Sequence, residues 1–301
     1  MLTALRCKDN KHGVGPSQQL HRNSAIRNYA TEANDGADEG GDMSAAQMEL
    51  AYEQPEGVSD KVWEGYAYIR DRTSDIDTLH NLPKQSSLEN LILEVSNAEE
   101  LRLLVPLVAR WRLCKGLQMT EKITQFLIEA SGRVGEPEIV VEILMDRWRY
   151  KLFPTSYGVS LLFKQLGDKA REAVKLEGEE SETAKALVDQ MYQVFVAYEE
   201  YGVEQDRFAY GALISASIEA GTDLGWERAV AMGEEAVKAY GDKPKLTFEA
   251  AHGLRGGFVR RGDTEKANKY TEVIENHGLK RTKRPIVHYD KEGRMKLQDR
   301  A

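Results

Sequence analysis

Apolar residues recur along this chain with a period of 35 residues. The stretches 86–120 and 121–155 are each 35 residues long, and apolar positions coincide when one is overlaid on the other. The coinciding pairs are Leu88 with Ile123, Leu91 with Phe126, Leu104 with Ile139, Val108 with Ile143 and Leu117 with Leu152. A fixed period of about 20 to 50 residues is typical of a solenoid, in which each unit buries its apolar face against its neighbours. The period therefore favours a binding or scaffolding role over catalysis.

Each unit carries two stretches with helical spacing. In the second unit the apolar residues of 123–130 recur at intervals of three and four, which places them on one side of a helix. A break follows at 132–137, where Pro137 suits the start of a second helix because proline is tolerated at the first helical position. Apolar residues of 139–144 form the stripe of that second helix, and Pro154 ends the unit. Two antiparallel helices per unit form a helical hairpin.

Three further units continue the pattern less regularly. They span 156–206, 207–245 and 246–280, so that about five units fill 86–280. The first of these three has 51 residues, and its excess matches the charged run 168–185, which we interpret as a solvated extension of the helices. We expect at least eight helices and no sheet in this region, stacked as an all-α, right-handed solenoid of hairpins. Four aromatic residues on the apolar stripes are predicted to be buried, namely Trp148, Phe153, Phe195 and Trp226.

Short motifs in these units resemble the pentatricopeptide repeat family. The stretch 207–214 (Arg-Phe-Ala-Tyr-Gly-Ala-Leu-Ile) is similar to the first helix of such a repeat, and 261–267 is similar to the polar glycine turn that opens the second. Units also end in glycine followed by an aliphatic residue, as at 116–117, 202–203 and 278–279. The related tetratricopeptide repeat has about 34 residues and a Trp/Gly/Tyr pattern that is not found here. The resemblance covers about two thirds of the chain.

The resemblance implies a test for base reading. In RNA-binding members of the family, one polar residue in the first helix and another at the end of the repeat together read one base of single-stranded RNA. The matching pairs are Asn90 with Thr120, Gln125 with Thr155, Ser160 with Asp206, Gly211 with Lys245 and Ala250 with Lys280. Only Ser160 with Asp206 has the chemistry of a reading pair. The other positions are interpreted as ordinary helix-surface residues, so we do not expect a base-by-base reader.

The first 29 residues resemble a mitochondrial transit peptide. They contain five basic residues and one acidic residue, a net charge of +4, together with two serines and no long apolar run. Basic, serine-containing and acid-poor segments are typical of such peptides. The step Arg27-Asn28-Tyr29-Ala30 resembles a matrix-peptidase cleavage site. We therefore predict a mature protein that begins near Ala30 in the mitochondrial matrix, with an ordinary disordered basic tail as the alternative interpretation.

Two segments lie between this peptide and the repeats. Residues 30–47 are acidic and rich in glycine, a composition that cannot bury enough surface to order itself, and they are interpreted as a linker. Residues 48–85 carry Trp63, Tyr66 and Ile69 at a spacing of three, which predicts one amphipathic helix. Because terminal units of a solenoid need a cap, this helix is expected to pack on the first repeat, and a partner-binding helix is the alternative.

Charge distinguishes an acidic body from a basic tail. The chain has a net charge of −8, whereas 278–301 holds eight basic and three acidic residues, a net charge of +5. RNA binding through phosphates depends on Lys and Arg, so the acid excess argues against the body as an RNA surface. The tail, 281–301 with the preceding Lys280, is a candidate RNA contact, and a solvated tail is the alternative. Its candidate residues are Lys280, Arg281, Lys283, Arg284, Tyr289 and Arg294.

The sequence offers no constellation of catalytic residues. Its six histidines are scattered, without metal-ligand spacing. The glycines of 253–257 lack the Lys-Ser/Thr ending of a phosphate loop, and close packing between helices explains them better. We assign no catalytic residue, cofactor, metal or small-molecule substrate, and no apolar stretch is long enough to predict a membrane span.

Two functions follow from these observations. The first is a non-catalytic structural component of a mitochondrial ribonucleoprotein, for which the small subunit of the mitochondrial ribosome is the favoured case, with ribosomal proteins and ribosomal RNA as partners. The second is a protein-only scaffold or assembly factor for a respiratory or other mitochondrial complex. The repeats, the transit peptide and the basic tail favour the first, whereas the acid excess favours the second.

Overall fold

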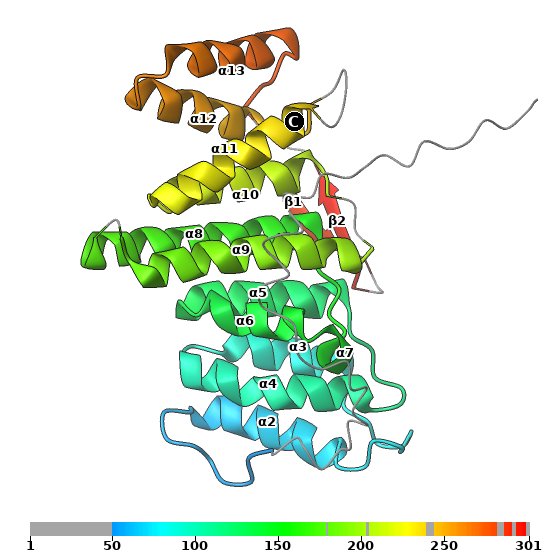
Figure 1. The fold of residues 1–301 in the computed structure, drawn as a ribbon. Coiled ribbons are helices and arrows are strands. Elements are labelled where there is room, and N and C mark those ends of the chain that lie inside the picture. Colours follow the sequence, from blue (N-terminus) through cyan, green and yellow to red (C-terminus); the bar gives the residue numbers. More distant parts are fainter. Residues whose placement is uncertain are drawn as a thin grey trace, which may run out of the picture. The chain divides into compact units, whose positions relative to one another are not determined.

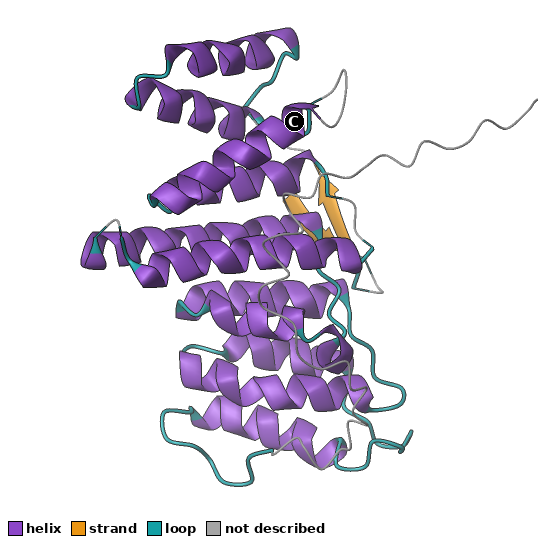
Figure 2. Ribbon diagram, in the orientation of Figure 1, coloured by secondary structure: helices purple, strands orange, loops and turns teal. Residues whose placement is uncertain are grey.

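The computed structural model describes most of the chain after residue 49. The described ranges are 50–178, 180–202, 205–238, 244–281, 286–290 and 293–298, all within the second of two units of the chain, Gly40–Ala301. The predicted transit peptide, its cleavage step at Tyr29 and Ala30, the linker 30–47, and Lys283 and Arg284 lie outside these ranges. Within them the protein is mostly helical, as the all-α prediction requires, with one small sheet (Figure 2).

The helices follow one another along the chain with short connections (Figure 1). They are α2 (Asp60–Arg72), α3 (Gln85–Glu94), α4 (Ala98–Leu113), α5 (Glu121–Val134), α6 (Pro137–Met145), α7 (Arg147–Tyr150), α8 (Ser156–Glu177), α9 (Glu182–Glu200), α10 (Arg207–Glu219), α11 (Asp223–Lys238), α12 (Phe248–Arg260) and α13 (Thr264–Asn276). The predicted minimum of eight helices between 86 and 280 is confirmed, and no strand lies among the described residues of that range. Helices α3, α5, α8, α10 and α12 begin within two residues of the predicted starts of the units.

Polar residues cap the starts of these helices. Thr120 precedes α5 and Thr155 precedes α8, and each side-chain oxygen accepts a hydrogen bond from a backbone N–H of the first turn. Because the first N–H groups of a helix have no partner within it, each such cap stabilises the helix by about 1 kcal/mol. The predicted break is also present, since Gly135 ends α5 with a φ of 77° and Pro137 is the first residue of α6. Short local motifs therefore set where the helices begin and end.

The helices pack in order along the chain. Helix α5 contacts α3 and α8, α8 contacts α10, and α10 contacts α12. The intervening helices form a second row, in which α6 contacts α4 and α9, and α9 contacts α11. The two rows are joined within the pairs α5–α6, α8–α9, α10–α11 and α12–α13. Successive pairs of helices therefore stack on one another as layers (Figure 1).

Aromatic side chains fill the interior between these layers. Phe195 of α9 is buried, with its ring centroid 6.4 Å from that of Phe163 on α8 and 5.0 Å from that of Tyr210 on α10. Burying a side chain of this size contributes about 1.5 to 3 kcal/mol to stability. The prediction for Phe195 is confirmed, whereas Trp226 is half-buried and packs edge-on against Phe258 at 5.0 Å.

The predicted burial of Trp148 and Phe153 is wrong. Trp148 is 86% exposed and Phe153 is 41% exposed. The apolar stripe of α6 ends at Met145, where Asp146 breaks the helix and caps the separate turn α7. That break changes the helical phase, so that Trp148 no longer continues the stripe. Phe153 belongs to the connection between α7 and α8, where its backbone N–H donates to the Thr124 hydroxyl at 2.9 Å.

Glycines mark two close approaches between helices. A Cβ on Gly257 of α12 would lie 2.1 Å from the Trp226 ring, and one on Gly167 of α8 would lie 3.0 Å from the backbone oxygen of Ala216. Glycine at these positions lets the backbones approach where a larger residue would clash. The interpretation of the 253–257 glycines as packing residues is thus confirmed for Gly257.

The charged run 168–185 falls on the end of α8 and the start of α9. It lengthens both helices, to 22 and 19 residues, beyond the other members of the stack. Leu176, near the end of α8, is 86% exposed. The extension thus adds helix turns that project past their neighbours (Figure 1).

Helix α2 is joined to the stack through a buried carboxylate. It contacts α3 and α4, and Glu100 of α4 is fully buried where they meet. The backbone N–H and hydroxyl of Ser59 donate to Glu100 Oε1 at 2.9 and 2.6 Å, and those of Ser96 donate to Oε2 at 2.7 and 2.8 Å. Burial alone raises the pKa of Glu100, but these four bonds outweigh burial and lower the pKa to about 2. The carboxylate therefore stays ionised and joins α4 to the start of α2.

Candidate nucleic-acid interface

The predicted base-reading positions within the units lie on α3, α5, α8, α10 and α12. We call the row formed by α5, α8, α10 and α12, with the residues that lead into each helix, the first-helix face. Most of the base-reading positions are used by the fold itself. Gln125 is buried against α8 beside Gly158, and its side-chain amide donates to Glu129 at 2.8 Å. The Ser160 hydroxyl donates to the Ser156 carbonyl of its own helix at 2.7 Å. Gly211 and Ala250 are buried, whereas Asn90 is exposed.

The second member of each pair also has a structural role. Thr120, Thr155 and Asp206 are the caps of α5, α8 and α10. Asp206 accepts from the backbone N–H groups of two residues of α10, both at 2.9 Å. Lys245 donates to the Gln205 carbonyl at 2.7 Å, and Lys280 is exposed. The pair Ser160 with Asp206 therefore carries out capping and internal hydrogen bonding, which leaves little of either side chain for a base.

The tail does not run free after α13 but folds into a hairpin. Strands β1 (Ile286–Tyr289) and β2 (Met295–Gln298) pair antiparallel, with Val287 opposite Leu297, and Tyr289 opposite Met295. Side chains alternate between the two sides of a strand. Val287, Tyr289 and Met295 are half-buried, whereas His288, Lys296 and Gln298 are exposed. The hairpin therefore has an apolar inner side and a polar outer side.

The inner side of this hairpin lies on the starts of α5 and α8. The Lys122 N–H donates to the Gly293 carbonyl at 3.0 Å, and the Met295 N–H donates to Glu121 Oε2 at 2.5 Å. Gly293 is in the left-handed region, with a φ of 73°, and a Cβ there would lie 3.1 Å from the Thr120 hydroxyl. The Thr155 hydroxyl lies 3.5 Å from the Met295 sulfur. Residues up to 174 positions apart in the sequence thus meet on the first-helix face (Figure 1).

Tyr289 anchors the hairpin to this face. Its ring packs edge-on against Phe126 of α5, with centroids 6.0 Å apart. The hydroxyl is buried and has no hydrogen-bond partner among the described residues. Burial raises the pKa of Tyr289, and the nearby Glu129, Tyr157 and Glu121 raise it further. The tyrosine that the sequence suggested as an RNA contact is thus engaged within the molecule.

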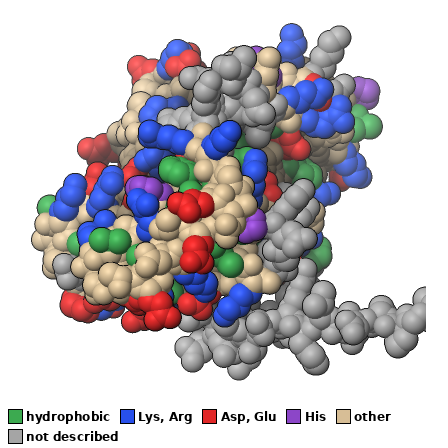
Figure 3. Space-filling model, turned by 90° about the horizontal axis from the view of Figure 1, so that it is seen from above, with side chains coloured by type: hydrophobic (Ala, Val, Ile, Leu, Met, Phe, Trp, Pro, Cys, Tyr) green, Lys and Arg blue, Asp and Glu red, His purple; other side chains and the backbone are tan. Residues whose placement is uncertain are grey.

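The basic residues of the tail fall into two groups. Lys280 and Arg281 are exposed where the chain leaves α13. Arg294 and Lys296 instead share Asp290, with Nε and Nζ at 2.9 and 3.8 Å from its carboxylate. The hairpin therefore partly neutralises its own charge. Lys and Arg side chains also lie over the end of the stack formed by α12 and α13, with acidic side chains along one border (Figure 3).

The part of the first-helix face on α10 and α12 carries aromatic residues that the sequence reasoning did not single out. Phe208 is 42% exposed and lies under the Arg207 guanidinium, 4.7 Å from it. Phe248 and His252 stack with centroids 5.6 Å apart. Aromatic rings beside cations are suited to stacking on unpaired bases. The spacing of four residues between Phe248 and His252 was visible in the sequence and was the available signal.

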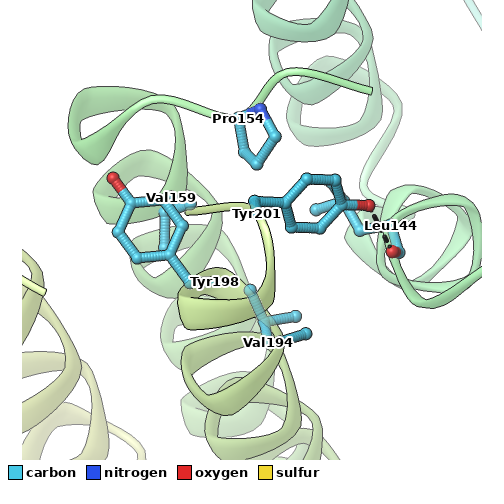
Figure 4. A pocket seen from close by; sticks show the side chains of 7 residues that line it. Leu144, Pro154, Val159, Val194, Tyr198 and Tyr201 are labelled. Carbon is cyan, nitrogen blue, oxygen red and sulfur yellow. Dashed lines mark hydrogen bonds between the residues drawn. The ribbon is translucent and has the colours of Figure 1, made fainter. Parts of the chain in front are cut away.

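Two cavities among the described residues differ in kind. One is an apolar space of about 10 Å³ between α6, α8 and α9, lined in part by Leu144, Tyr198 and Tyr201 (Figure 4). The Tyr201 hydroxyl donates to the Leu144 carbonyl at 2.6 Å across it. A volume of this size holds at most about one water molecule. The other is an open hollow of about 450 Å³ near Arg112, Lys151 and Phe153.

Within the part of the chain that the structure describes, no three or more histidine, cysteine, aspartate or glutamate side chains gather in a way that would hold a metal ion. None of the described helices combines the length and the apolar character that crossing a bilayer requires.

Comparisons with known proteins provide no family for this chain. No model of a known protein family matches it, and no curated protein sequence matches it.

Proposed function

We propose that this chain is a non-catalytic helical-repeat protein of the mitochondrial matrix and a structural component of a ribonucleoprotein, with the small subunit of the mitochondrial ribosome as the favoured case. Its partners would be ribosomal proteins and ribosomal RNA. The proposal includes a right-handed solenoid of about five pentatricopeptide-like hairpins over 86–280. The order of helix contacts and the agreement between helix starts and unit boundaries support that architecture.

One observation carries the proposal that RNA is contacted without base reading. Most of the positions that read bases in the related repeats are helix caps or buried residues here, and the hairpin lies over two of them, Thr120 and Thr155. A protein with this arrangement is suited to binding RNA by charge and shape at a fixed place. Lys280 and Arg281 are exposed directly after α13, which gives phosphates an accessible cluster of charge.

Charge reversal of the cluster tests this proposal. Lys280, Arg281, Lys283 and Arg284 would be replaced together by Glu. Each Lys or Arg held at a phosphate releases a counterion, so the wild-type protein should leave the small subunit more readily as salt rises. The variant should fail to co-sediment with the small subunit, while its circular dichroism and melting temperature stay nearly unchanged, because exposed charges contribute within about 0.5 kcal/mol.

The matched control reverses four other exposed lysines and so changes the net charge equally. Suitable positions are Lys61, Lys84, Lys175 and Lys238. This control should remain bound to the subunit. Normal co-sedimentation of the tail variant, or equal loss of both variants, would rule out the tail as an RNA anchor.

A protein-only scaffold or assembly factor is the second candidate. The net charge of −8 and the exposed Trp148 favour it, since an acidic body repels RNA and exposed tryptophan is common at protein interfaces. Sedimentation of mitochondrial lysate separates the two functions. The first predicts travel with ribosomal subunits whose position shifts after ribonuclease treatment, and the second predicts travel with a complex that resists ribonuclease.

A further inference from the structure

The open hollow near α7 differs chemically from the first-helix face. It measures about 450 Å³ and lies between the residues that follow α4 and those that follow α7. Its lining residues are Arg112, Leu117, Gln118, Met119, Lys151 and Phe153. A volume of this size accommodates a few side chains of another molecule.

The hollow has positive charge that the fold does not neutralise. Arg112 and Lys151 are its only charged lining residues, and neither side chain makes a hydrogen bond or ion pair with the described residues. The Arg112 Nε is buried without a partner. A buried donor without a partner costs free energy, and a bound anion would remove that cost. The hollow therefore favours an anionic occupant.

The backbone holds Lys151 in an unusual conformation at this place. Its φ is 48°, in the left-handed region, where its N–H donates to the Arg147 carbonyl at 3.0 Å and closes α7. Few residues other than glycine adopt this region, and such positions gather at functional sites. Lys151 is thus fixed at the hollow by the end of a helix rather than carried on a loose loop.

Exposed apolar side chains occur in the lining of the hollow and in the chain segment just before it. Phe153 lines it at 41% exposure, and Trp148 and Met145, one or two turns earlier in the chain, are 86% and 46% exposed. Exposing large apolar side chains to water costs free energy, so a group of them indicates a binding surface. Tryptophan and arginine are also the residues that most often dominate protein interfaces.

We propose that this hollow binds a segment of a protein partner in which an acidic side chain stands beside a bulky apolar one. Arg112 and Lys151 would hold the carboxylate, while Phe153, Met119 and Trp148 would cover the apolar side chain. RNA fits less well, because a phosphate backbone needs a row of cations. The lining of this hollow supplies two cations, Arg112 and Lys151, rather than a row. The surface is compatible with either function proposed above and depends on neither.

Selection from random peptides tests the proposal. Dodecapeptides displayed on phage would be selected on the wild-type chain, with removal of those that also bind Arg112→Glu/Lys151→Glu. The selected peptides should combine Asp or Glu with Phe, Trp or Leu. As synthetic peptides they should bind the double variant at least about tenfold more weakly, since opposite charges then become like charges. Trp148→Ala should weaken binding about fivefold or more.

Matched controls test whether the loss of peptide binding is specific to substitutions at the hollow. Leu176→Ala removes an apolar side chain that is 86% exposed, as Trp148 is, and Arg260→Glu/Lys269→Glu makes the same charge change on α12 and α13. Both controls should bind the peptides like wild type. Circular dichroism of each variant checks folding, and Lys151→Glu alone repeats the test at an exposed residue.

Three outcomes would overturn the proposal. One is a failure to enrich acidic-apolar sequences on the wild type. Another is binding that the Arg112, Lys151 and Trp148 variants leave unchanged. The third is a labelled twelve-nucleotide oligouridine that binds the hollow and loses affinity in the Arg112→Glu/Lys151→Glu variant, which would assign the surface to single-stranded nucleic acid.

Discussion

The first-helix face has a covered part and an open part, built from the same kind of helix. On α5 and α8 the hairpin occupies the surface, with Tyr289 on Phe126 and the Gly293 carbonyl on the Lys122 N–H. On α10 and α12, Phe208 is 42% exposed and Phe248 stacks on His252 of its own helix. The two parts thus differ in what covers them rather than in how they are made.

The covered part also differs from the open part in which group accepts a hydrogen bond from the first N–H groups of a helix. The Lys122 N–H is the second of α5 and has no partner within the helix, so it depends on the hairpin carbonyl. At the start of α10 the corresponding N–H, that of Phe208, donates instead to its own cap, Asp206. In the covered part, the start of α5 thus leaves one backbone N–H for the hairpin, which lies 170 residues or more further along the chain. In the open part, the corresponding N–H of α10 is bonded by the cap of its own helix.

Removing the hairpin should give the largest effect. A chain ending at Arg281 loses the Tyr289 and Met295 packing and two hydrogen bonds between the hairpin and α5. We expect this loss to lower the free energy of unfolding by about 3 kcal/mol. Amide exchange at Lys122 should accelerate strongly. Phe208→Ala in the open part is the control, with a change within about 0.5 kcal/mol. Unchanged exchange at Lys122 after truncation would show that the hairpin does not cover α5 in solution.

Loss of the Glu100 carboxylate should have the next largest effect on the free energy of unfolding. It should not distinguish the covered from the open part of the first-helix face. Glu100→Gln disturbs four hydrogen bonds from Ser59 and Ser96, and we expect a loss of about 2 kcal/mol at pH 7. Because the folded pKa is about 2 and the usual value is 4.5, the carboxylate contributes stability above pH 4.5 that disappears as pH falls toward 2.

Urea unfolding between pH 7 and pH 2 measures this contribution. The difference between wild type and Glu100→Gln should shrink across that range, and the Lys122 amide should remain protected in the variant at pH 7. A constant difference down to pH 2 would contradict the assignment of the ionised form to the buried site.

Replacement of the buried Tyr289 hydroxyl should have the smallest effect on the free energy of unfolding. Tyr289→Phe keeps the ring on Phe126 and removes a buried group without a described partner, so stability at pH 7 should be equal or higher by up to about 1 kcal/mol. Burial raises the pKa of Tyr289, so the folded protein favours the neutral phenol over the phenolate. The wild-type protein is therefore unaffected below the usual pKa of 10.0 and loses stability as pH rises above it.

Urea unfolding at pH 7 and above pH 10 provides the measurement. The variant should lose less stability than wild type on the alkaline side. A loss of more than about 1 kcal/mol at pH 7 would mean that the hydroxyl is hydrogen-bonded and contributes to docking.

Sequence reasoning worked where a few neighbouring residues decide the outcome. The predicted unit starts at 121 and 156 are helix starts because Thr120 and Thr155 each cap the turn that follows. The predicted break at 132–137 is present because Gly135 and Pro137 also act within one turn. Sequence reasoning failed at Trp148, because a break at one residue, Asp146, changes the phase of every later position. The apolar period of the units remains visible in the sequence, while the orientation of one side chain depends on such a break.

The sequence by itself determined a mostly helical chain, the start of the first helix in each unit and a charge contrast between body and tail. Only the tertiary structure decided that the tail meets α5 and α8, that Gln125 is buried, and that Arg112 and Lys151 share a hollow. The reason is distance along the chain. Helices, caps and strands depend on groups a few residues apart, whereas these contacts exist only after stacking brings residues such as Glu121 and Met295 within 2.5 Å.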